Sequence, residues 1–190
     1  MVAGQGTAEA GMGADAYDNS PRARRVFEVG TKITRINLME VCFGDQTGEL
    51  SKTEIAQPAL TAADMADYLY MEELGFKPDA GEGHSMGEIP LLGMAGVISI
   101  EGMFKLIKVR GEASAKLRPG MMARVQNMSI EQIEHELGHL FTSGRLAVTN
   151  FNSLLQHMLS GDEDLIMAAR DIVKNRAKQV AELKNAKISR

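Results

Sequence analysis

The sequence predicts an α/β protein, and two patterns of elements indicate this fold class. Around residues 61–95 the chain is expected to run helix, strand, tight turn, helix, which is typical of an α/β core. Residues 121–188 are expected to run strand, helix, strand, strand, helix, strand, which is the ferredoxin-like order. The composition shifts at Pro119. We therefore predict a core domain over residues 1–118 and a small subdomain over residues 119–188.

Capping residues and glycines bound the elements expected in the first domain. Ser20 and Pro21 indicate a helix start, because serine caps the first turn and proline fits position N1. Gly75 ends the following long helix, with Pro78 just beyond it. Between these boundaries the apolar residues recur at helical spacing. The spacing predicts helices at residues 23–33, 38–42, 61–74, 86–95 and 101–117, a loop at 44–48 and a strand at 80–83.

The second domain has equally clear boundaries. Ser129 followed by Gln132 forms a capping box, so a helix is expected from there to Leu140. Asp162 is the expected N-cap of a second helix that extends to about residue 178. The strands are expected at residues 121–126, 146–150, 156–159 and 180–188.

The composition excludes several classes of function. With 190 residues, 44% hydrophobic and 24% charged, the chain has the profile of a soluble globular protein. Its net charge of −4 argues against nucleic acid as a partner, because phosphate binding requires a basic face. Residues 89–100, the longest uncharged apolar stretch, are too few to cross a membrane. The absence of a secretory pattern and the single cysteine, Cys42, lead us to expect a cytoplasmic protein.

Residues 83–88, with the sequence Gly-His-Ser-Met-Gly-Glu, match the G-x-S-x-G pattern of a nucleophile elbow. In such an elbow a serine, here Ser85, stands on a tight turn with its hydroxyl raised above a sheet edge. The two glycines permit the strained turn and the close approach of neighbouring backbone. The backbone N–H of Met86 then points to the place where an acyl oxyanion forms. The motif alone is only a moderate signal, because three fixed positions in five recur by chance.

Several other short segments accompany this motif in a fixed order along the chain. They are Gly4-Gln5-Gly6, Gly11-Met12-Gly13, Ser20-Pro21-Arg22-Ala23-Arg24-Arg25-Val26-Phe27, Gln57-Pro58-Ala59-Leu60, Lys77-Pro78-Asp79-Ala80, Val109-Arg110-Gly111 and Asn150-Phe151-Asn152-Ser153. Together with the elbow they make the chain resemble the malonyl-coenzyme A:acyl carrier protein transacylases and the related acyltransferase domains of fatty-acid and polyketide synthases. The resemblance extends over nearly the whole chain. It implies a hydrolase-like α/β core with an inserted ferredoxin-like subdomain.

The resemblance also implies roles for residues of the active site. Ser85 is the implied acyl-accepting nucleophile, and the backbone N–H groups of Gln5 and Met86 are the implied oxyanion hole. Arg110 is implied to bind the free carboxylate of the malonyl group, for which a guanidinium fork is suited.

Two further residues, His84 and Asn152, are implied to belong to the substrate site, His84 as a hydrogen-bonding partner rather than as the base. The implied reaction moves a malonyl group from malonyl-coenzyme A to the phosphopantetheine thiol of acyl carrier protein through a malonyl-serine intermediate. Ping-pong kinetics are expected, and neither a metal nor another cofactor is implied.

The sequence departs from the family pattern at the general base. A serine hydroxyl needs an imidazole within hydrogen-bond reach, and the family's histidine lies after the inserted subdomain, whereas no histidine follows His157 here. We therefore expect a fragment or split gene product, with a core incomplete after residue 190, or a homologue that lacks its base. The alternative functions are a catalytically inactive docking module and a simple ester or thioester hydrolase. Smaller departures are Ala8 for a glutamine, Glu82 at an apolar strand position and Leu154-Leu155 for Pro-Gly.

A second motif indicates a different chemistry. Residues 135–139 match H-E-x-x-H, which places two imidazoles on one helix face for zinc, with Glu136 as general base. Gly138 weakens that helix, and no third histidine continues the motif. Glu163 and Glu182 remain as candidate third ligands. The resemblance places this helix on the outside of the small subdomain, so a zinc peptidase is kept as the minor alternative.

Overall fold

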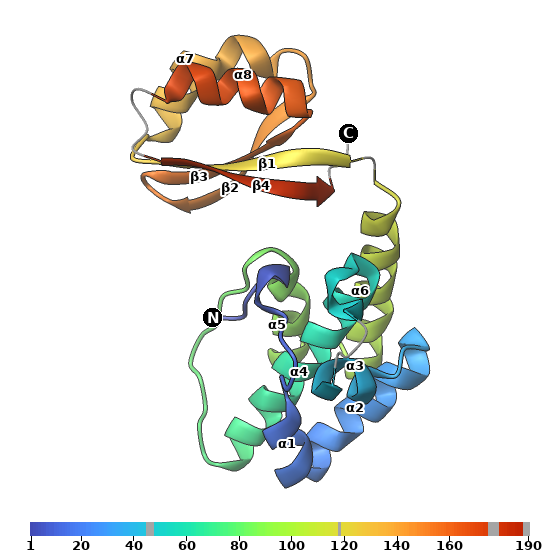
Figure 1. Ribbon diagram of the computed structural model, residues 1–190. Helices are drawn as coiled ribbons and strands as arrows, with labels where there is room; N and C mark the ends of the chain where they lie inside the picture. Colours follow the sequence, from blue (N-terminus) through green and yellow to red (C-terminus); the bar gives the residue numbers. More distant parts are fainter. Residues whose placement is uncertain (45–47, 118, 175–178, 188–190) are drawn as a thin grey trace. The chain divides into compact units, whose positions relative to one another are not determined.

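The computed structural model describes residues 1–44, 48–117 and 119–174, together with the backbone of residues 179–187. It is a helix-rich α/β structure (Figure 1). The chain forms two compact units, which we call the N-terminal unit, Met1–Ala115, and the C-terminal unit, Lys116–Arg190. Each unit has its own hydrophobic core, so each is described by itself.

The N-terminal unit is almost entirely helical. Ser20 Oγ accepts a hydrogen bond from Ala23 N at 3.1 Å, and Pro21 occupies position N1 of the helix, so the predicted helix start is confirmed. The α-helices are α1 (Ala14–Asn19), α2 (Pro21–Thr34), α3 (Leu38–Gly44), α4 (Thr53–Glu73), α5 (Glu88–Met94) and α6 (Ile100–Ala115). Short 3₁₀ helices are η1 (Gln5–Thr7), η2 (Glu49–Ser51) and η3 (Ser85–Gly87). Of the loop predicted at 44–48, residues 45–47 lie outside the described residues.

The start of α4 was predicted wrongly. The helix begins at Thr53 rather than at Thr61, and it includes Pro58. A proline inside a helix removes one backbone hydrogen bond and ordinarily disfavours the helix there. The residues on both sides of Pro58 are buried in the core, so packing stabilises the helix through it.

The strand predicted at residues 80–83 was also largely wrong. Among the residues that the structure describes, the only pairing in that segment is an isolated parallel bridge between Val2 and Gly83. In it, Val2 N donates to Glu82 O at 2.8 Å and His84 N donates to Val2 O at 2.9 Å. Glu82 is exposed, so its carboxylate has no burial cost. The bridge connects the first residues of the chain to the segment that precedes Ser85.

Helices α2, α4 and α6 surround the core of the N-terminal unit. Phe27 and Phe104 are fully buried at its centre. A Cβ atom added at Gly30 of α2 would lie only 2.6 Å from atoms of Leu38 and Phe104, so α2 packs closely against its neighbours. The segment that carries Ser85 follows α4, one of the helices of this core.

The C-terminal unit is a four-stranded antiparallel sheet with two helices on one face (Figure 1). Its elements are β1 (Pro119–Gln126), α7 (Ile130–Phe141), β2 (Leu146–Ser153), β3 (Gln156–Gly161), α8 (Glu163–Val173) and β4 (Gln179–Lys187). The strand order is β2-β3-β1-β4. This sequence of elements is the predicted one, although α8 is described only to Val173 and residues 175–178 and 188 lie outside the described residues.

The two helices of this unit begin differently, because a side chain caps α7 but not α8. The predicted capping box is confirmed: Ser129 N donates to Gln132 Oε1 at 2.8 Å, and Gln132 N donates to Ser129 Oγ at 3.4 Å. Asp162 holds the N-cap position of α8, as predicted, but its Oδ2 pairs with Arg145 Nη1 at 2.8 Å rather than capping the helix. Among the residues that the structure describes, no helix has the length and apolarity needed to cross a bilayer. The cytoplasmic location stays a prediction.

Candidate active site

Ser85 stands at a sharp turn with a left-handed backbone conformation. Its φ angle is 57°, whereas the preceding His84 is extended, with φ −92° and ψ 122°. A left-handed conformation costs a non-glycine residue on the order of 1–2 kcal/mol. Gly87 N donates to His84 O at 3.0 Å and closes the turn, and Ser85 itself is exposed. The backbone therefore presents the serine side chain to solvent, as the elbow motif predicts.

The two glycines of the motif are required by close backbone contacts. A Cβ atom at Gly83 would lie 2.5 Å from Glu88 N and from the carbonyl group of Gly87. A Cβ atom at Gly87 would lie 2.5 Å from Val2 O and 2.6 Å from Ala3 O. The elbow thus packs against the N-terminal segment without room for a single methyl group.

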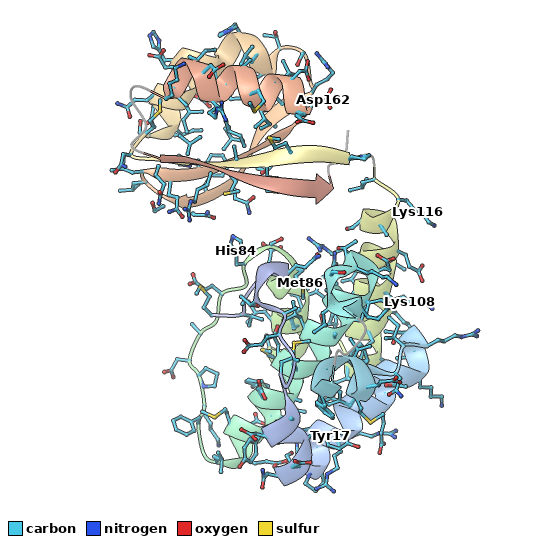
Figure 2. All side chains as sticks on the ribbon, in the orientation of Figure 1. Tyr17, His84, Met86, Lys108, Lys116 and Asp162 are labelled. Atoms are coloured by element: carbon cyan, nitrogen blue, oxygen red, sulfur yellow. The ribbon has the colours of Figure 1, made fainter. Side chains whose placement is uncertain are left out.

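The same contact brings the Gly-Gln-Gly turn beside Ser85. A Cβ atom at Gly4 would lie 3.0 Å from Nδ1 of His84 and 3.6 Å from Cβ of Ser85. In Figure 2, His84 and Met86 lie where the loop after α4 meets the N-terminal segment. Gln5 and Met86 each lie in the first turn of a 3₁₀ helix, where backbone N–H groups have no intrahelical acceptor. The assignment of both N–H groups to an oxyanion hole stays a prediction.

Arg110 is a half-buried cation on α6. Its Nη1 donates to Oε1 of Gln57 at 2.6 Å, and Gln57, on α4, is only 1% exposed. No carboxylate in the described part of the chain forms an ion pair with Arg110. Burial lowers the pKa of the Arg110 guanidinium, and the charge of Glu88 partly offsets that effect. A partly desolvated cation with free N–H donors is a site for an anion.

The remaining two predicted site residues differ in their placement. His84 is exposed and adjoins Ser85 in the N-terminal unit. Asn152 belongs to β2 of the C-terminal unit, where its Nδ2 donates to Gln156 Oε1 at 3.4 Å. The structure thus brings together five of the six predicted residues in one unit, and the assignment of Asn152 to the substrate site stays a prediction.

Sequence reasoning missed the hydrogen bonds of Gln57 and Thr53 to two of the predicted site residues. Both side chains of α4 are hydrogen-bonded to the side chain of Gln5, and Gln57 also reaches Arg110. Gln57 was noted only as part of a family segment. The signal that could have revealed it is a glutamine placed within the apolar run 55–60, because a buried amide needs polar partners.

The zinc alternative receives no support from the geometry. His135 and His139 lie on α7 and both are exposed. Among the described residues, no three His, Cys, Asp or Glu side chains form a group that could hold a metal ion. Cys42 is buried, and desolvation raises the pKa of its thiol to about 12, so it is no nucleophile at neutral pH.

The N-terminal unit thus contains a serine on a left-handed turn, backbone N–H groups in the first turns of two 3₁₀ helices, and a half-buried arginine without an ion pair to a described carboxylate. These are the kinds of group that acyl transfer through a serine uses. Comparison with known proteins agrees. The model of the acyl transferase domain family matches residues 1–187, so the chain belongs to that family and the predicted resemblance is confirmed.

The relatives are more specific. The chain is 31% identical over 188 residues to a malonyl CoA-acyl carrier protein transacylase of Bacillus subtilis, covering 96% of this chain and 59% of the relative. It superposes on the crystal structure of a malonyl CoA-acyl carrier protein transacylase from Clostridium perfringens with a TM-score of 0.88 and 31% identity, over 97% of this chain and 60% of that one. A malonyl-transacylase in complex with a type II PKS acyl-carrier protein gives a TM-score of 0.85 at 28% identity, over 97% and 62%. The chain thus spans about three fifths of these proteins.

Proposed function

We propose that the protein transfers a malonyl group from malonyl-coenzyme A to the phosphopantetheine thiol of an acyl carrier protein through a malonyl-serine intermediate. The observation that carries the proposal is the placement of Ser85, the first-turn N–H groups and Arg110 in one unit. Similar proteins carry names that state this activity, and one is solved with its carrier. We assign the function to the fatty-acid and polyketide branch of the family.

The proposed fold assignment follows from the same comparison. We describe residues 1–118 as an α/β core of the hydrolase-like type and residues 119–188 as an inserted ferredoxin-like subdomain. Supporting this, the C-terminal unit has the element order and antiparallel strand order β2-β3-β1-β4 of ferredoxin-like folds. The elbow glycines and the Val2–Gly83 bridge support the assignment of the first domain.

The first half-reaction forms an ester at Ser85. The hydroxyl oxygen attacks the thioester carbonyl carbon, and the negative charge that develops on the carbonyl oxygen is stabilised by the N–H groups of Gln5 and Met86. Collapse of that intermediate expels coenzyme A as its thiol and leaves malonyl on Ser85. The proton of the hydroxyl passes to a base and then to the leaving sulfur. We assign no residue of the N-terminal unit to the role of base.

The second half-reaction reverses the first with a different thiol. The carrier thiol attacks the ester carbonyl, the same N–H groups stabilise the oxyanion, and Ser85 leaves with a proton. Throughout both steps Arg110 binds the free carboxylate of the malonyl group. Because this carboxylate compensates a half-buried cation, acyl groups that lack it are disfavoured.

Intact-mass spectrometry after incubation with malonyl-coenzyme A tests the proposal. A malonyl adduct is expected on the folded chain and not on Ser85→Ala, and Arg110→Ala is expected to reduce malonyl labelling relative to acetyl labelling. The absence of any adduct on the folded chain would contradict transfer and favour the docking module. Release of malonate to water without a carrier would indicate a hydrolase instead.

A further inference from the structure

A continuous series of hydrogen bonds connects Arg110 to Gln5 across α4. Arg110 Nη1 donates to Gln57 Oε1 at 2.6 Å. Gln57 Nε2 donates to Thr53 Oγ1 at 2.9 Å and to Gln5 Oε1 at 3.3 Å. Thr53 Oγ1 donates to Gln5 Oε1 at 2.7 Å. All four residues belong to the N-terminal unit. The series joins the residue expected to bind the malonyl carboxylate to the turn expected to bind the thioester oxygen.

The chemistry of the four groups gives this series one direction. A guanidinium only donates hydrogen bonds, so Gln57 must present its amide oxygen to Arg110. Its NH₂ group then faces the Thr53 hydroxyl and Gln5. Because the hydroxyl already accepts from Gln57, its one proton goes to the amide oxygen of Gln5. Gln57 is 1% exposed, so water cannot replace a lost partner.

We propose that Thr53 and Gln57 are positioning residues that hold Arg110 at a set distance from the Gln5 turn. The inference rests on the proposed function. A malonyl thioester carries its carboxylate and its reacting carbonyl one methylene apart, so both must be recognised together. An arginine free to change rotamer would bind the carboxylate without aligning the carbonyl with Ser85. This series of hydrogen bonds from Arg110 to Gln5, which we call the relay, therefore contributes to the preference for malonyl over an acyl group without a carboxylate.

Two substitutions interrupt the relay in different ways. Thr53→Val keeps the shape of the side chain but removes both hydrogen bonds of the hydroxyl. We expect the malonyl preference to fall about 10-fold, the effect of weakening a hydrogen bond to a charged group. Gln57→Glu places a carboxylate on Arg110 and removes the NH₂ donor to Thr53 and Gln5. We expect it to abolish the malonyl preference, because the new carboxylate occupies the position on Arg110 where the substrate carboxylate would bind.

Equilibrium binding tests this without requiring turnover. In the full chain carrying Ser85→Ala, dissociation constants are measured for malonyl-coenzyme A and acetyl-coenzyme A. The readout is the constant for acetyl-coenzyme A divided by the constant for malonyl-coenzyme A, which is large when malonyl is preferred. Arg110→Ala reports on the proposed function and is expected to lower the ratio about 100-fold. Thr53→Ser restores the hydroxyl and is expected to restore the ratio, which a merely structural role of Thr53 would not predict.

Thr61→Val is the matched control for Thr53→Val. Thr61 lies on the same helix and is fully buried, and its hydroxyl has no hydrogen-bond partner among the described residues. It is expected to leave the ratio unchanged. If Arg110→Ala lowers the ratio while folded Thr53→Val and Gln57→Glu keep the parent value, the relay is refuted and the proposed function stands. If Arg110→Ala itself leaves the ratio unchanged, the proposed function fails and the relay fails with it.

Discussion

Substituting Gly87 with alanine separates the N-terminal segment from the elbow by a calculable amount. The new Cβ atom would lie 2.5 Å from Val2 O and 2.6 Å from Ala3 O, whereas real Cβ atoms essentially never come closer than 3.0 Å. The backbone must therefore move by at least 0.5 Å, the difference between 3.0 and 2.5 Å. Neither atom belongs to a flexible side chain, so the whole segment has to shift.

That shift acts directly on the bridge between Val2 and Gly83. Val2 O is both the atom that the methyl group would displace and the acceptor of the 2.9 Å bond from His84 N. The 2.8 Å bond from Val2 N to Glu82 O lies in the same bridge. Losing two backbone hydrogen bonds at about 1 kcal/mol each, with about 1 kcal/mol of strain, predicts a destabilisation of about 3 kcal/mol.

Urea unfolding followed by tyrosine fluorescence measures this change in the correct unit. The chain has no tryptophan, and its three tyrosines are Tyr17, Tyr68 and Tyr70, all in the N-terminal unit. Gly6→Ala is the matched control, because an added Cβ atom there meets nothing within 4 Å. We expect the control to change the free energy of unfolding by less than about 0.5 kcal/mol. Equal unfolding midpoints for Gly87→Ala and Gly6→Ala would refute the close contact.

Three further substitutions test other features. Thr61→Val removes a buried hydroxyl that has no hydrogen-bond partner among the described residues, and it should raise the free energy of unfolding by about 1 kcal/mol in the tyrosine assay. If Thr61→Val instead lowers the free energy of unfolding by about 1 kcal/mol, the hydroxyl forms a hydrogen bond in the folded chain. Burial and the neighbouring Asp67 raise the pKa of Asp64 from 3.8 to about 6 in the folded chain. As the pH rises, the unfolded chain therefore loses this proton before the folded chain does, and the free energy of unfolding falls between about pH 4 and pH 6. Asp64→Asn should reduce that decline by roughly 2 kcal/mol, allowing for partial exposure, and parallel pH profiles of the two proteins would count against it. Gly138→Ala adds a methyl group to α7 that meets nothing within 4 Å. It should stabilise the C-terminal unit by about 1 kcal/mol, measured by far-UV circular dichroism during urea unfolding. An unchanged unfolding midpoint would show that Gly138 does not lower the stability of α7.

The elements with local boundary signals were predicted well. Ser20 with Pro21 and Ser129 with Gln132 satisfy their own helix ends through bonds three residues along the chain. Such bonds depend on neighbouring residues only, so the sequence contains all the information needed. The order of elements in the C-terminal unit could be predicted for the same reason.

The start of α4 and the segment before the elbow depend on distant residues instead. The helix continues through Pro58 because the surrounding turns are buried against α2 and α6. In the described part of the chain, residues 80–83 have no adjacent strand beyond the single bridge to Val2, so they do not form a strand themselves. Local sequence preferences cannot reveal the helices that pack around Pro58 or the segment at Val2, since these lie more than 20 residues away along the chain.

The candidate site divides in the same way. The turn at Ser85 could be predicted from its two glycines, whose role is purely backbone geometry. The hydrogen bonding and partial burial of Arg110 could not be predicted, because they depend on three segments, η1, α4 and α6, that meet only in the folded chain. An arginine on a helix is ordinarily a surface cation. What distinguishes Arg110 is a buried amide that occupies one of its donors, while no carboxylate among the described residues forms an ion pair with it and the charge of Glu88 only partly offsets its burial. Folding thus keeps a half-buried charge that forms no ion pair with a described carboxylate, which costs stability that an anionic substrate would restore. On this argument malonyl-coenzyme A should stabilise the folded N-terminal unit more than acetyl-coenzyme A does.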